Sequence, residues 1–379
     1  MRFLYVAPRY HTNQVPIMRG LKREGHEVCF ISQYAGKVED YSDVTPIVVG
    51  YSRLYLMFDA CYMKLMSKCD KRAGDRKIKC GFPPVGKLAR AIRESGADVA
   101  ILRERSVYSI FATLLCRKYH IPTILYNQSP LWEDKIKNDL PHRLMRALTP
   151  KVRMTPVMGT QKPGKVIEPG AVFVPFVMEP EMAPEERAWQ KDGIIHIFTI
   201  GKYETRKNQQ MMIEVVEELS KRYLLHLTIA GECSTAAHQA YYDGLKNYIK
   251  AHGLEHKVTL LSNLNRQQVG EEYRKADLFV IPSTLEPASI SQLEAMAYSL
   301  PVICGDKNGT ACYVENGANG WQFKDNDRQA LTEAVEKIIS DSEEMKRMGA
   351  QSFVFIKEKY QIDAYLAGIS QLMECEKKL

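Results

Sequence analysis

The sequence predicts an α/β protein made of two Rossmann-like domains that face a cleft. The chain has 379 residues, too many for one ordinary hydrophobic core, so two domains are expected. In both halves short apolar runs alternate with amphipathic helical patterns, which is typical of parallel sheets covered by helices. The alternation restarts after the proline-spaced residues 163–184, and the two domains are expected to join near residues 176–190.

The N-terminal half begins with an apolar run at residues 2–8, which predicts the first strand. A helix is expected over 13–25, where Gly25 ends it in the left-handed conformation. Three more strands are expected in this half, at residues 26–32, 98–102 and 122–126.

The C-terminal half repeats the alternation. Five strands are expected, at residues 194–201, 224–231, 257–262, 277–283 and 301–305. A helix over 208–222 follows the first of them, and ligands in such folds bind at the carboxyl ends of the strands. We therefore expect an N-terminal domain over 1–175, a second domain over 176–350 and a terminal helix over 351–379 that packs back on the first domain.

The composition is that of a globular protein, with 45% hydrophobic and 26% charged residues. No run of 18 apolar residues indicates a membrane-spanning helix, and the N-terminal apolar run is interpreted as a strand rather than a signal peptide. The nine cysteines are scattered and form no CxxC pair, which favours a reduced, cytoplasmic protein without disulfides or a zinc site.

The two halves differ in charge. Residues 1–175 contain 29 Lys and Arg against 15 Asp and Glu, a net charge of +14, whereas the remainder has 23 against 30, a net charge of −7. A basic half of this kind suits nucleic acid, anionic lipid or a phosphorylated substrate as a partner.

Two glutamates bracket an expected helix start in the sequence EPASISQLEAMA, residues 286–297. The proline that follows Glu286 disfavours helical geometry there, so this carboxylate stays in the loop. Ser289 is a suitable N-cap, and it leaves the amides of Ile290 and Ser291 at a helix end that favours phosphate. Glu294 lies about one turn further along.

A second loop follows the strand that ends near Gly201, and it offers Lys202, Arg206 and Lys207. Basic side chains near a helix N-terminus, with a carboxylate on either side, suit an elongated ligand with a central diphosphate and hydroxyl groups at both ends. A nucleotide sugar has this shape. The alternative interpretation is that the glutamates are ordinary solvated residues and that the basic loop is a surface turn.

Three segments resemble the C-terminal domain of the retaining glycosyltransferases of family 4, which have the GT-B fold: IGKYETRKN at 200–208, the stretch from ADLFVIPST to PVICGD at 276–306, and NGANGWQF at 316–323. Residues 20–32 and 96–127 resemble the N-terminal domain of this family more loosely. The resemblance implies an enzyme that transfers a sugar from a nucleotide diphosphate to an acceptor.

The resemblance also implies roles for these residues. Glu294 is expected to bind the nucleotide ribose, and Glu286 is expected to contact the donor sugar. Lys202 and Lys207 are expected to hold the diphosphate, so that Glu286 and the two lysines form the catalytic set. The remaining donor-binding residues are expected to be Ser289, Ile290, Ser291, Gly201 and Arg206. No cofactor or metal is required, and a UDP-sugar is favoured over a GDP-sugar.

The acceptor side departs from the family pattern. The first loop lacks the glycine pair that many relatives have, and a position that is often histidine is Gln128 here, which cannot carry a proton charge. The residues after the strand at 98–102 could contact an acceptor or form a surface ion pair. The acceptor-side candidates are Arg9, Tyr10, His11, Arg103, Glu104 and Gln128.

The triplet DND at 325–327 resembles a metal-binding motif of other glycosyltransferases. It lies between a strand and a helical pattern, so Asp327 is interpreted as a helix N-cap and no metal site is predicted.

Residues 53–66 place Leu54, Phe58, Cys61 and Leu65 on one helical face, followed by a basic tract at 68–79. Such a segment could dock on an anionic membrane, or the helix could pack against the N-terminal sheet. Docking fits a cytoplasmic enzyme that is peripheral at the inner face of a membrane, with a glycan or lipid-linked acceptor in polysaccharide or glycolipid biosynthesis.

Two other classes remain open. A GT-B phosphorylase or a nucleotide-sugar epimerase could use the same donor site. A basic protein that binds nucleic acid is the non-enzymatic alternative, but no RNA-binding motif or aromatic-interleaved basic tract supports it, so nucleic acid is not expected as a partner.

Overall fold

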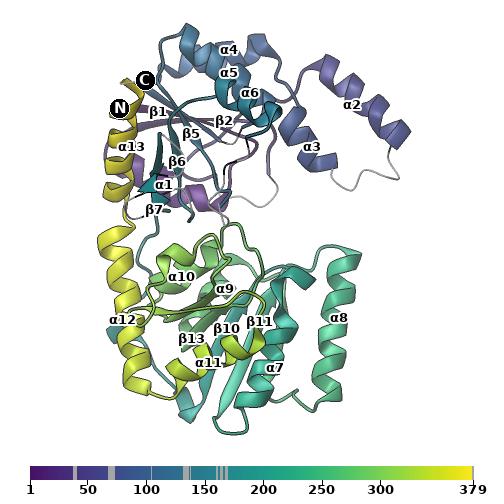
Figure 1. Cartoon of the computed structure of the whole chain (residues 1–379), viewed down its shortest axis with the longest axis vertical. Helices are drawn as coiled ribbons and strands as arrows, with labels where there is room; N and C mark the ends of the chain where they lie inside the picture. Colours follow the sequence, from purple (N-terminus) through teal and green to yellow (C-terminus); the bar gives the residue numbers. More distant parts are fainter. Residues whose placement is uncertain are drawn as a thin grey trace. The chain divides into compact units, whose positions relative to one another are not determined.

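The computed structural model consists of two compact units, residues 1–177 with 362–379 and residues 178–361, which are described separately (Figure 1). The structure describes residues 1–36, 41–66, 73–103, 105–130, 136, 138–158, 161–162, 165–166 and 170–377.

The first unit is built on a parallel sheet of seven strands in the order β3-β2-β1-β4-β5-β6-β9. The strands are β1 (Arg2–Ala7), β2 (Glu27–Ser32), β3 (Ile47–Val48), β4 (Val99–Arg103), β5 (Thr123–Tyr126), β6 (Arg153–Thr155) and β9 (Ala171–Phe173). A separate antiparallel pair consists of β7 (Gln161–Lys162) and β8 (Lys165–Val166). The parallel order places the carboxyl ends of β1, β4 and β5 at one edge of the sheet.

Helices cover both faces of this sheet. The alternate side chains of β1 point to opposite faces and enter two different hydrophobic clusters. Phe3 and Tyr5 join the cluster that contains residues of α1 and α13, whereas Leu4 and Val6 join the cluster that contains residues of α4 and α5. The helices of the unit are α1 (Val15–Arg23), α2 (Arg53–Met66), α3 (Ala73–Cys80), α4 (Val85–Ser95), α5 (Val107–Lys118), α6 (Leu140–Leu148) and α13 (Ile362–Lys377). Helix α1 continues a short 3-10 turn, η1 (Thr12–Gln14).

The last helix, α13, returns to the N-terminal sheet. The hydroxyl groups of Tyr5 and Tyr365 are 2.7 Å apart in a buried hydrogen bond. A Cβ atom added at Gly20 would lie 2.8 Å from Ile362, so glycine lets α1 and α13 approach closely. This contact makes the end of the chain part of the first unit.

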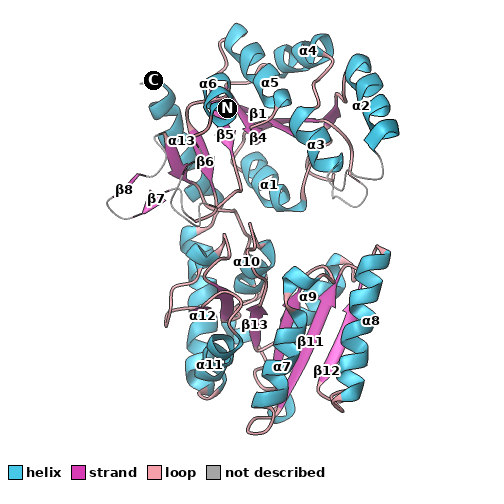
Figure 2. Ribbon diagram, turned by 45° about the vertical axis from the view of Figure 1, so that its right-hand side comes forward, coloured by secondary structure: helices cyan, strands magenta, loops and turns pink. Residues whose placement is uncertain are grey.

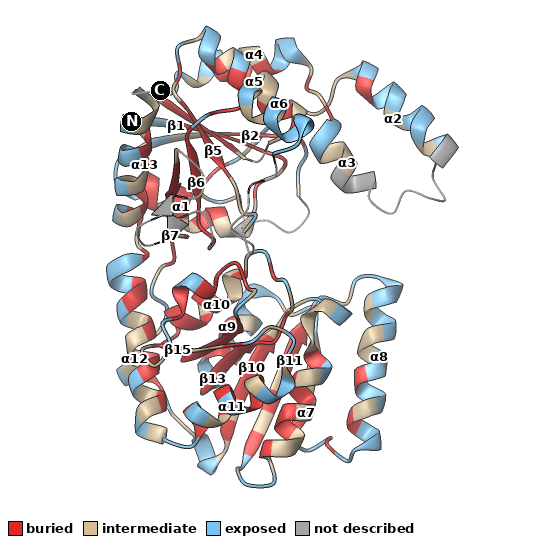
Figure 3. Ribbon diagram, in the orientation of Figure 1, coloured by how far each residue is buried: buried red, intermediate tan, exposed pale blue. Residues whose placement is uncertain are grey.

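The second unit contains a parallel sheet of six strands in the order β12-β11-β10-β13-β14-β15. The strands are β10 (Ile195–Ile200), β11 (Leu225–Gly231), β12 (Val258–Ser262), β13 (Leu278–Ile281), β14 (Val302–Gly305) and β15 (Gly320–Phe323). Its helices are α7 (Gln209–Leu219), α8 (Ala236–Ala251), α9 (Arg266–Lys275), α10 (Ile290–Ala297), α11 (Arg328–Ile339) and α12 (Ser342–Lys359). Four 3-10 turns complete it: η2 (Pro184–Glu186), η3 (Lys191–Gly193), η4 (Thr205–Lys207) and η5 (Ala311–Tyr313). Helices flank the strands of each sheet in Figure 2, and buried residues are concentrated on the strands in Figure 3.

The predicted alternation agrees with the structure at the strands named from the sequence and at the helices expected over 13–25 and 208–222, whereas the single terminal helix expected over 351–379 is instead the end of α12 followed by α13. Gly25 follows the end of α1 with φ of 75°, as a left-handed cap requires. The units divide at Val177 and at Gln361, whereas boundaries after 175 and 350 were expected. The second difference is large, because α12 packs Met345 and Met348 into the core of the second unit and only α13 joins the first.

Candidate functional site

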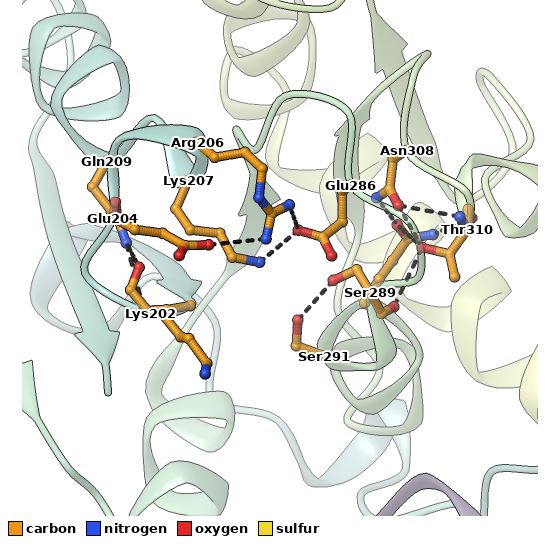
Figure 4. A network of polar contacts seen from close by, with 12 residues as sticks. Lys202, Glu204, Arg206, Lys207, Gln209, Glu286, Ser289, Ser291, Asn308 and Thr310 are labelled. Carbon is orange, nitrogen blue, oxygen red and sulfur yellow. Dashed lines mark hydrogen bonds and ion pairs between the residues drawn. The ribbon is translucent and has the colours of Figure 1, made fainter. Parts of the chain in front are cut away.

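A buried carboxylate with two cations lies where β10 and β13 end in the second unit. The side chain of Glu286 is 8% exposed, and its Oε2 is 2.5 Å from Nζ of Lys207 and 2.8 Å from Nη1 of Arg206. Arg206 also donates to Glu204, with 2.9 Å between Nη2 and Oε1. In Figure 4 Arg206 and Lys207 both point toward Glu286 from the loop that follows β10.

The local backbone explains this convergence. The loop after β10 makes the turn η4, and Asn208 then takes a left-handed conformation with φ of 49°. A Cβ atom added at Gly201 would lie 3.1 Å from Cδ of Lys207, so glycine leaves room for the lysine side chain to fold back. The amide of Thr284 donates to the carbonyl oxygen of Arg206 at 2.9 Å, which joins the two loops. The cations are therefore positioned by backbone as well as by charge.

The charge state of Glu286 follows from its neighbours. Burial by itself raises the pKa of this carboxyl, but Lys207 and Arg206 outweigh burial and the pKa is lowered overall. Leu285, immediately before it, has φ of 46°, a sparsely populated conformation for a residue with a branched side chain. Strain of this kind beside a charged, buried side chain is typical of functional sites.

The first turn of α10 has no side-chain cap. Ser289 occupies the N-cap position, as predicted, but its hydroxyl contacts the Ser291 hydroxyl at 3.0 Å and makes no capping hydrogen bond. Ser289 therefore leaves the amides of the first turn uncapped, and the helix dipole favours an anion there.

A buried polar network that the sequence reasoning missed holds this helix start in place. Gln292 donates to the carbonyl oxygen of Thr310 at 2.9 Å and accepts from the Asn308 amide at 3.2 Å. The Thr310 hydroxyl donates to the carbonyl oxygen of Ser289 at 3.3 Å. Asn308 and Thr310 follow β14, so the rule that parallel strands end at one edge could have indicated them.

Glu294 lies one turn into α10, as predicted. Its Oε2 accepts from the Tyr273 hydroxyl at 3.0 Å, and the same hydroxyl contacts the carbonyl oxygen of Ser291 at 3.1 Å. Burial raises the pKa of Glu294, while the Tyr273 hydrogen bond and Arg266 act in the opposite direction. A hydrogen bond to a hydroxyl ligand would further satisfy this partly buried carboxyl.

Lys202 does not join the other two cations. Its Nζ is 3.2 Å from Oε2 of Glu232, and both side chains are about half exposed. Figure 4 shows its amine pointing away from Glu286. The structure therefore brings Arg206 and Lys207 together with Glu286 and leaves Lys202 outside this group.

The acceptor-side candidates fall into three groups. Arg9, His11, Arg103 and Gln128 lie together beyond the ends of β1, β4 and β5 in the first unit: Nη2 of Arg103 donates to the Gln128 side-chain oxygen at 2.5 Å, and Nε of Arg9 is 3.4 Å from Nε2 of His11. Tyr10 is a core residue instead, 1% exposed, with its ring edge-on to Phe30 at 5.1 Å. Glu104 lies outside the described residues.

The charges around His11 show how basic this group is. Burial, then Arg103 and Arg9, lower the pKa of His11 to about 3. The imidazole is therefore neutral at physiological pH and can hydrogen-bond a ligand without carrying charge.

The triplet at 325–327 takes structural roles. Asp327 caps α11 by accepting from the Ala330 amide at 3.1 Å, as predicted. Asp325 accepts from the Thr284 hydroxyl at 2.6 Å. Within the described ranges, no three His, Cys, Asp or Glu side chains are grouped closely enough to hold a metal ion. Within the same ranges, no helix is long and apolar enough to cross a membrane.

Comparisons with known proteins agree on the second unit. Residues 184–353 match the family model of glycosyl transferases group 1. An uncharacterized glycosyltransferase of Methanocaldococcus jannaschii is 29% identical over 146 residues, which are 38% of this chain and 36% of that protein. The lipopolysaccharide core biosynthesis mannosyltransferase LpcC of Rhizobium leguminosarum is 28% identical over 141 residues, 37% of this chain and 40% of that protein. The matches thus span well under half the length of these relatives.

Similarity of fold to a solved structure extends over nearly the whole chain. HepE of Anabaena, solved in complex with UDP, superposes with a TM-score of 0.72 at 14% identity and covers 99% of this chain and 100% of its own. Two units with parallel sheets and a last helix that returns to the first unit give the GT-B fold. The second unit therefore contains a glycosyl transferase group 1 domain, and the whole chain has the GT-B fold.

Proposed function

We propose that this chain is a retaining glycosyltransferase that moves a sugar from a nucleotide diphosphate to an acceptor hydroxyl. The observation that carries the proposal is the pairing of Glu286 with Lys207 and Arg206 beside the uncapped first turn of α10. An anion site next to a buried carboxylate matches a ligand that has a diphosphate followed by sugar hydroxyls.

The donor is assigned to these groups in order along its length. The ribose hydroxyls bind Glu294, and the diphosphate binds the amides of Ile290 and Ser291 together with Lys207 and Arg206. The transferred sugar contacts Glu286. A UDP-sugar is favoured over a GDP-sugar, and support comes from HepE, which was solved with UDP and with UDP-glucose.

The chemistry follows from the charge that develops on the donor. The bond between the anomeric carbon and the β-phosphate oxygen breaks, and the acceptor oxygen forms the new bond on the same face. The acceptor proton passes to the departing phosphate. Negative charge on that phosphate grows in the transition state, where Lys207, Arg206 and the helix amides stabilise it, so no metal ion is required.

On the acceptor side, Arg9, His11, Arg103 and Gln128 offer several donors to an acceptor with hydroxyl or anionic groups. We propose a glycan or a lipid-linked acceptor used in cell-surface polysaccharide or glycolipid biosynthesis. The match to a lipopolysaccharide mannosyltransferase supports this choice. The reaction is assigned to the cytoplasm, at the inner face of a membrane.

The test is to screen the purified protein against UDP-, GDP- and ADP-sugars for thermal stabilisation and for slow hydrolysis of the donor. Stabilisation by UDP-sugars, and a released sugar that keeps its anomeric configuration by NMR, are expected with or without EDTA. Isomerisation of the donor alone would indicate an epimerase, and transfer that requires inorganic phosphate would indicate a phosphorylase. Either result would overturn the proposal.

A further inference from the structure

Helix α2 of the first unit exposes an apolar face. Leu54, Met57 and Phe58 are 55%, 67% and 65% exposed, and Cys61 beside them is also exposed. Met57 and Phe58 each lie three or four residues from both Leu54 and Cys61, so the four residues form one stripe along the helix. Figure 3 shows α2 as a largely exposed helix next to α3. Burying such residues would be favourable, so their exposure together calls for a partner.

One flank of α2 is packed, whereas Leu56, on the side away from the stripe, is 41% exposed. Tyr55 is 7% exposed and its ring lies 5.6 Å from Tyr51 and 5.7 Å from Phe82. Asp59 forms an ion pair with Arg76 of α3, with 2.8 Å between Oδ1 and Nη1. The helix is thus anchored on its unit by one side, and the apolar stripe is an additional surface rather than a displaced part of the core.

The charge around the stripe has one dominant sign. Residues 51–80 contain eight Lys and Arg and three Asp, a net charge of +5, and so supply much of the net charge of the chain. Among the described side chains, Arg53 and Lys64 of α2 are exposed, and so is Lys79 of α3. Lys71 and Arg72 of the basic tract, and the side chain of Leu65, lie outside the described residues.

We propose that α2 lies in the surface of an anionic lipid bilayer, with Leu54, Met57 and Phe58 among the acyl chains and the flanking cations among the headgroups. An apolar helix face with basic flanks has the character of an interfacial membrane-binding helix. A second copy of the chain is a poorer occupant, because it would bring two segments of net charge +5 together. This inference rests on the proposed function, because binding to a membrane would bring the enzyme to a lipid-linked acceptor.

The direct experiment is co-sedimentation of the full chain with vesicles. Phosphatidylcholine vesicles containing about 30% phosphatidylglycerol should bind the protein, whereas pure phosphatidylcholine should bind it at least about tenfold more weakly. Raising the salt from about 0.1 M to about 0.5 M should weaken binding to the anionic vesicles. Equal, negligible binding to both vesicle types would overturn the proposal.

Variants separate the helix from the charge of the rest of the unit. Phe58→Asp should lower the partition coefficient by about tenfold or more, and Lys64→Glu by severalfold. The matched controls are Leu224→Asp and Lys221→Glu, which change an exposed leucine and an exposed lysine of the second unit and should leave binding unchanged. Equal loss with Phe58→Asp and Leu224→Asp would contradict a role for α2.

Two readouts distinguish this proposal from its alternatives. In Phe58→Trp the indole emission should shift to shorter wavelength when anionic vesicles are added, and Leu224→Trp should show no shift. Concentration-dependent dimers in sedimentation velocity without lipid, abolished by Phe58→Asp, would assign the stripe to a second copy instead. The Phe58→Asp protein should keep its thermal stabilisation by UDP, so loss of membrane binding and failure of the proposed donor site give different results.

Discussion

Cationic side chains lie at the strand ends of both units, but the groups that they contact differ. In the second unit Arg206 and Lys207 share one buried carboxylate, Glu286, and the neighbouring helix start is fixed by a buried network. In the first unit Arg103 donates to an amide oxygen, and burial, together with the charges of Arg103 and Arg9, lowers the pKa of His11.

This difference indicates two kinds of binding surface. The second unit is organised before any ligand arrives, which suits a donor whose leaving group must be met by fixed charges. The first unit concentrates positive charge and hydrogen-bond donors, which suits selection of an acceptor. Four substitutions test whether the two surfaces have separate roles.

The largest effect is expected for Lys207→Ala. Removing a cation that stabilises the departing phosphate should lower kcat by about 10² to 10³. The matched control is Lys202→Ala: this lysine forms an exposed ion pair with Glu232, so kcat should change by less than about threefold. Steady-state kinetics of both variants, with thermal melts to check folding, make the comparison. Equal activities in the two variants would contradict the separate placement of Lys207.

Glu294→Ala should weaken UDP binding by about 1.5–3 kcal/mol, because a charged hydrogen bond to the ribose is lost. Tyr273→Phe removes only the hydroxyl that contacts this carboxylate and keeps the buried ring, so it is the control. Calorimetric titration of UDP should show a much smaller loss for Tyr273→Phe. Comparable losses would mean that Glu294 acts through packing around Tyr273.

His11→Gln should change how stability depends on pH. The folded-state pKa of His11 is about 3, below its ordinary value of 6.5, so the unfolded chain takes up this proton first. The contribution of His11 to the free energy of unfolding is therefore fully present above pH 6.5, and it declines as the pH falls toward 3. Thermal melts between about pH 7 and pH 4 should fall less steeply for the variant than for the native chain. Parallel profiles would show that His11 keeps an ordinary pKa.

The smallest effect is expected for Arg103→Ala on the donor. The dissociation constant of UDP should stay within about twofold, since Arg103 belongs to the acceptor-side group, while transfer to an acceptor should fall relative to donor hydrolysis. A loss of UDP affinity as large as that of Glu294→Ala would remove the distinction between the two surfaces.

The sequence alone predicts the strands best where apolar runs are long. The runs at β1, β10 and β13 are buried on both faces, and their period and length identify them directly. The short strand β3 was missed, because Ile47 and Val48 are exposed and two residues are too few to show a strand pattern. β6 was missed because its three residues include a buried arginine, Arg153.

The sequence predicts candidate site residues, but it cannot predict how their side chains pair. Lys202 and Lys207 look alike in sequence, and only the turn η4 with the left-handed Asn208 aims Arg206 and Lys207 at Glu286. Tyr10 was expected on the acceptor side with Arg9 and His11, but tertiary packing places its ring in the core. Contacts of this kind join residues that are distant in sequence, so the spacing of residues along the chain cannot predict them.

In the proposed donor site, the nucleotide diphosphate binds at the start of α10 beside Lys207. A crystal structure of the protein with UDP would test this placement. The β-phosphate should lie within hydrogen-bond distance of the amides of Ile290 and Ser291 and of Nζ of Lys207, with the ribose hydroxyls on Glu294. UDP bound elsewhere, with the first turn of α10 and Lys207 making no contact to phosphate, would contradict it.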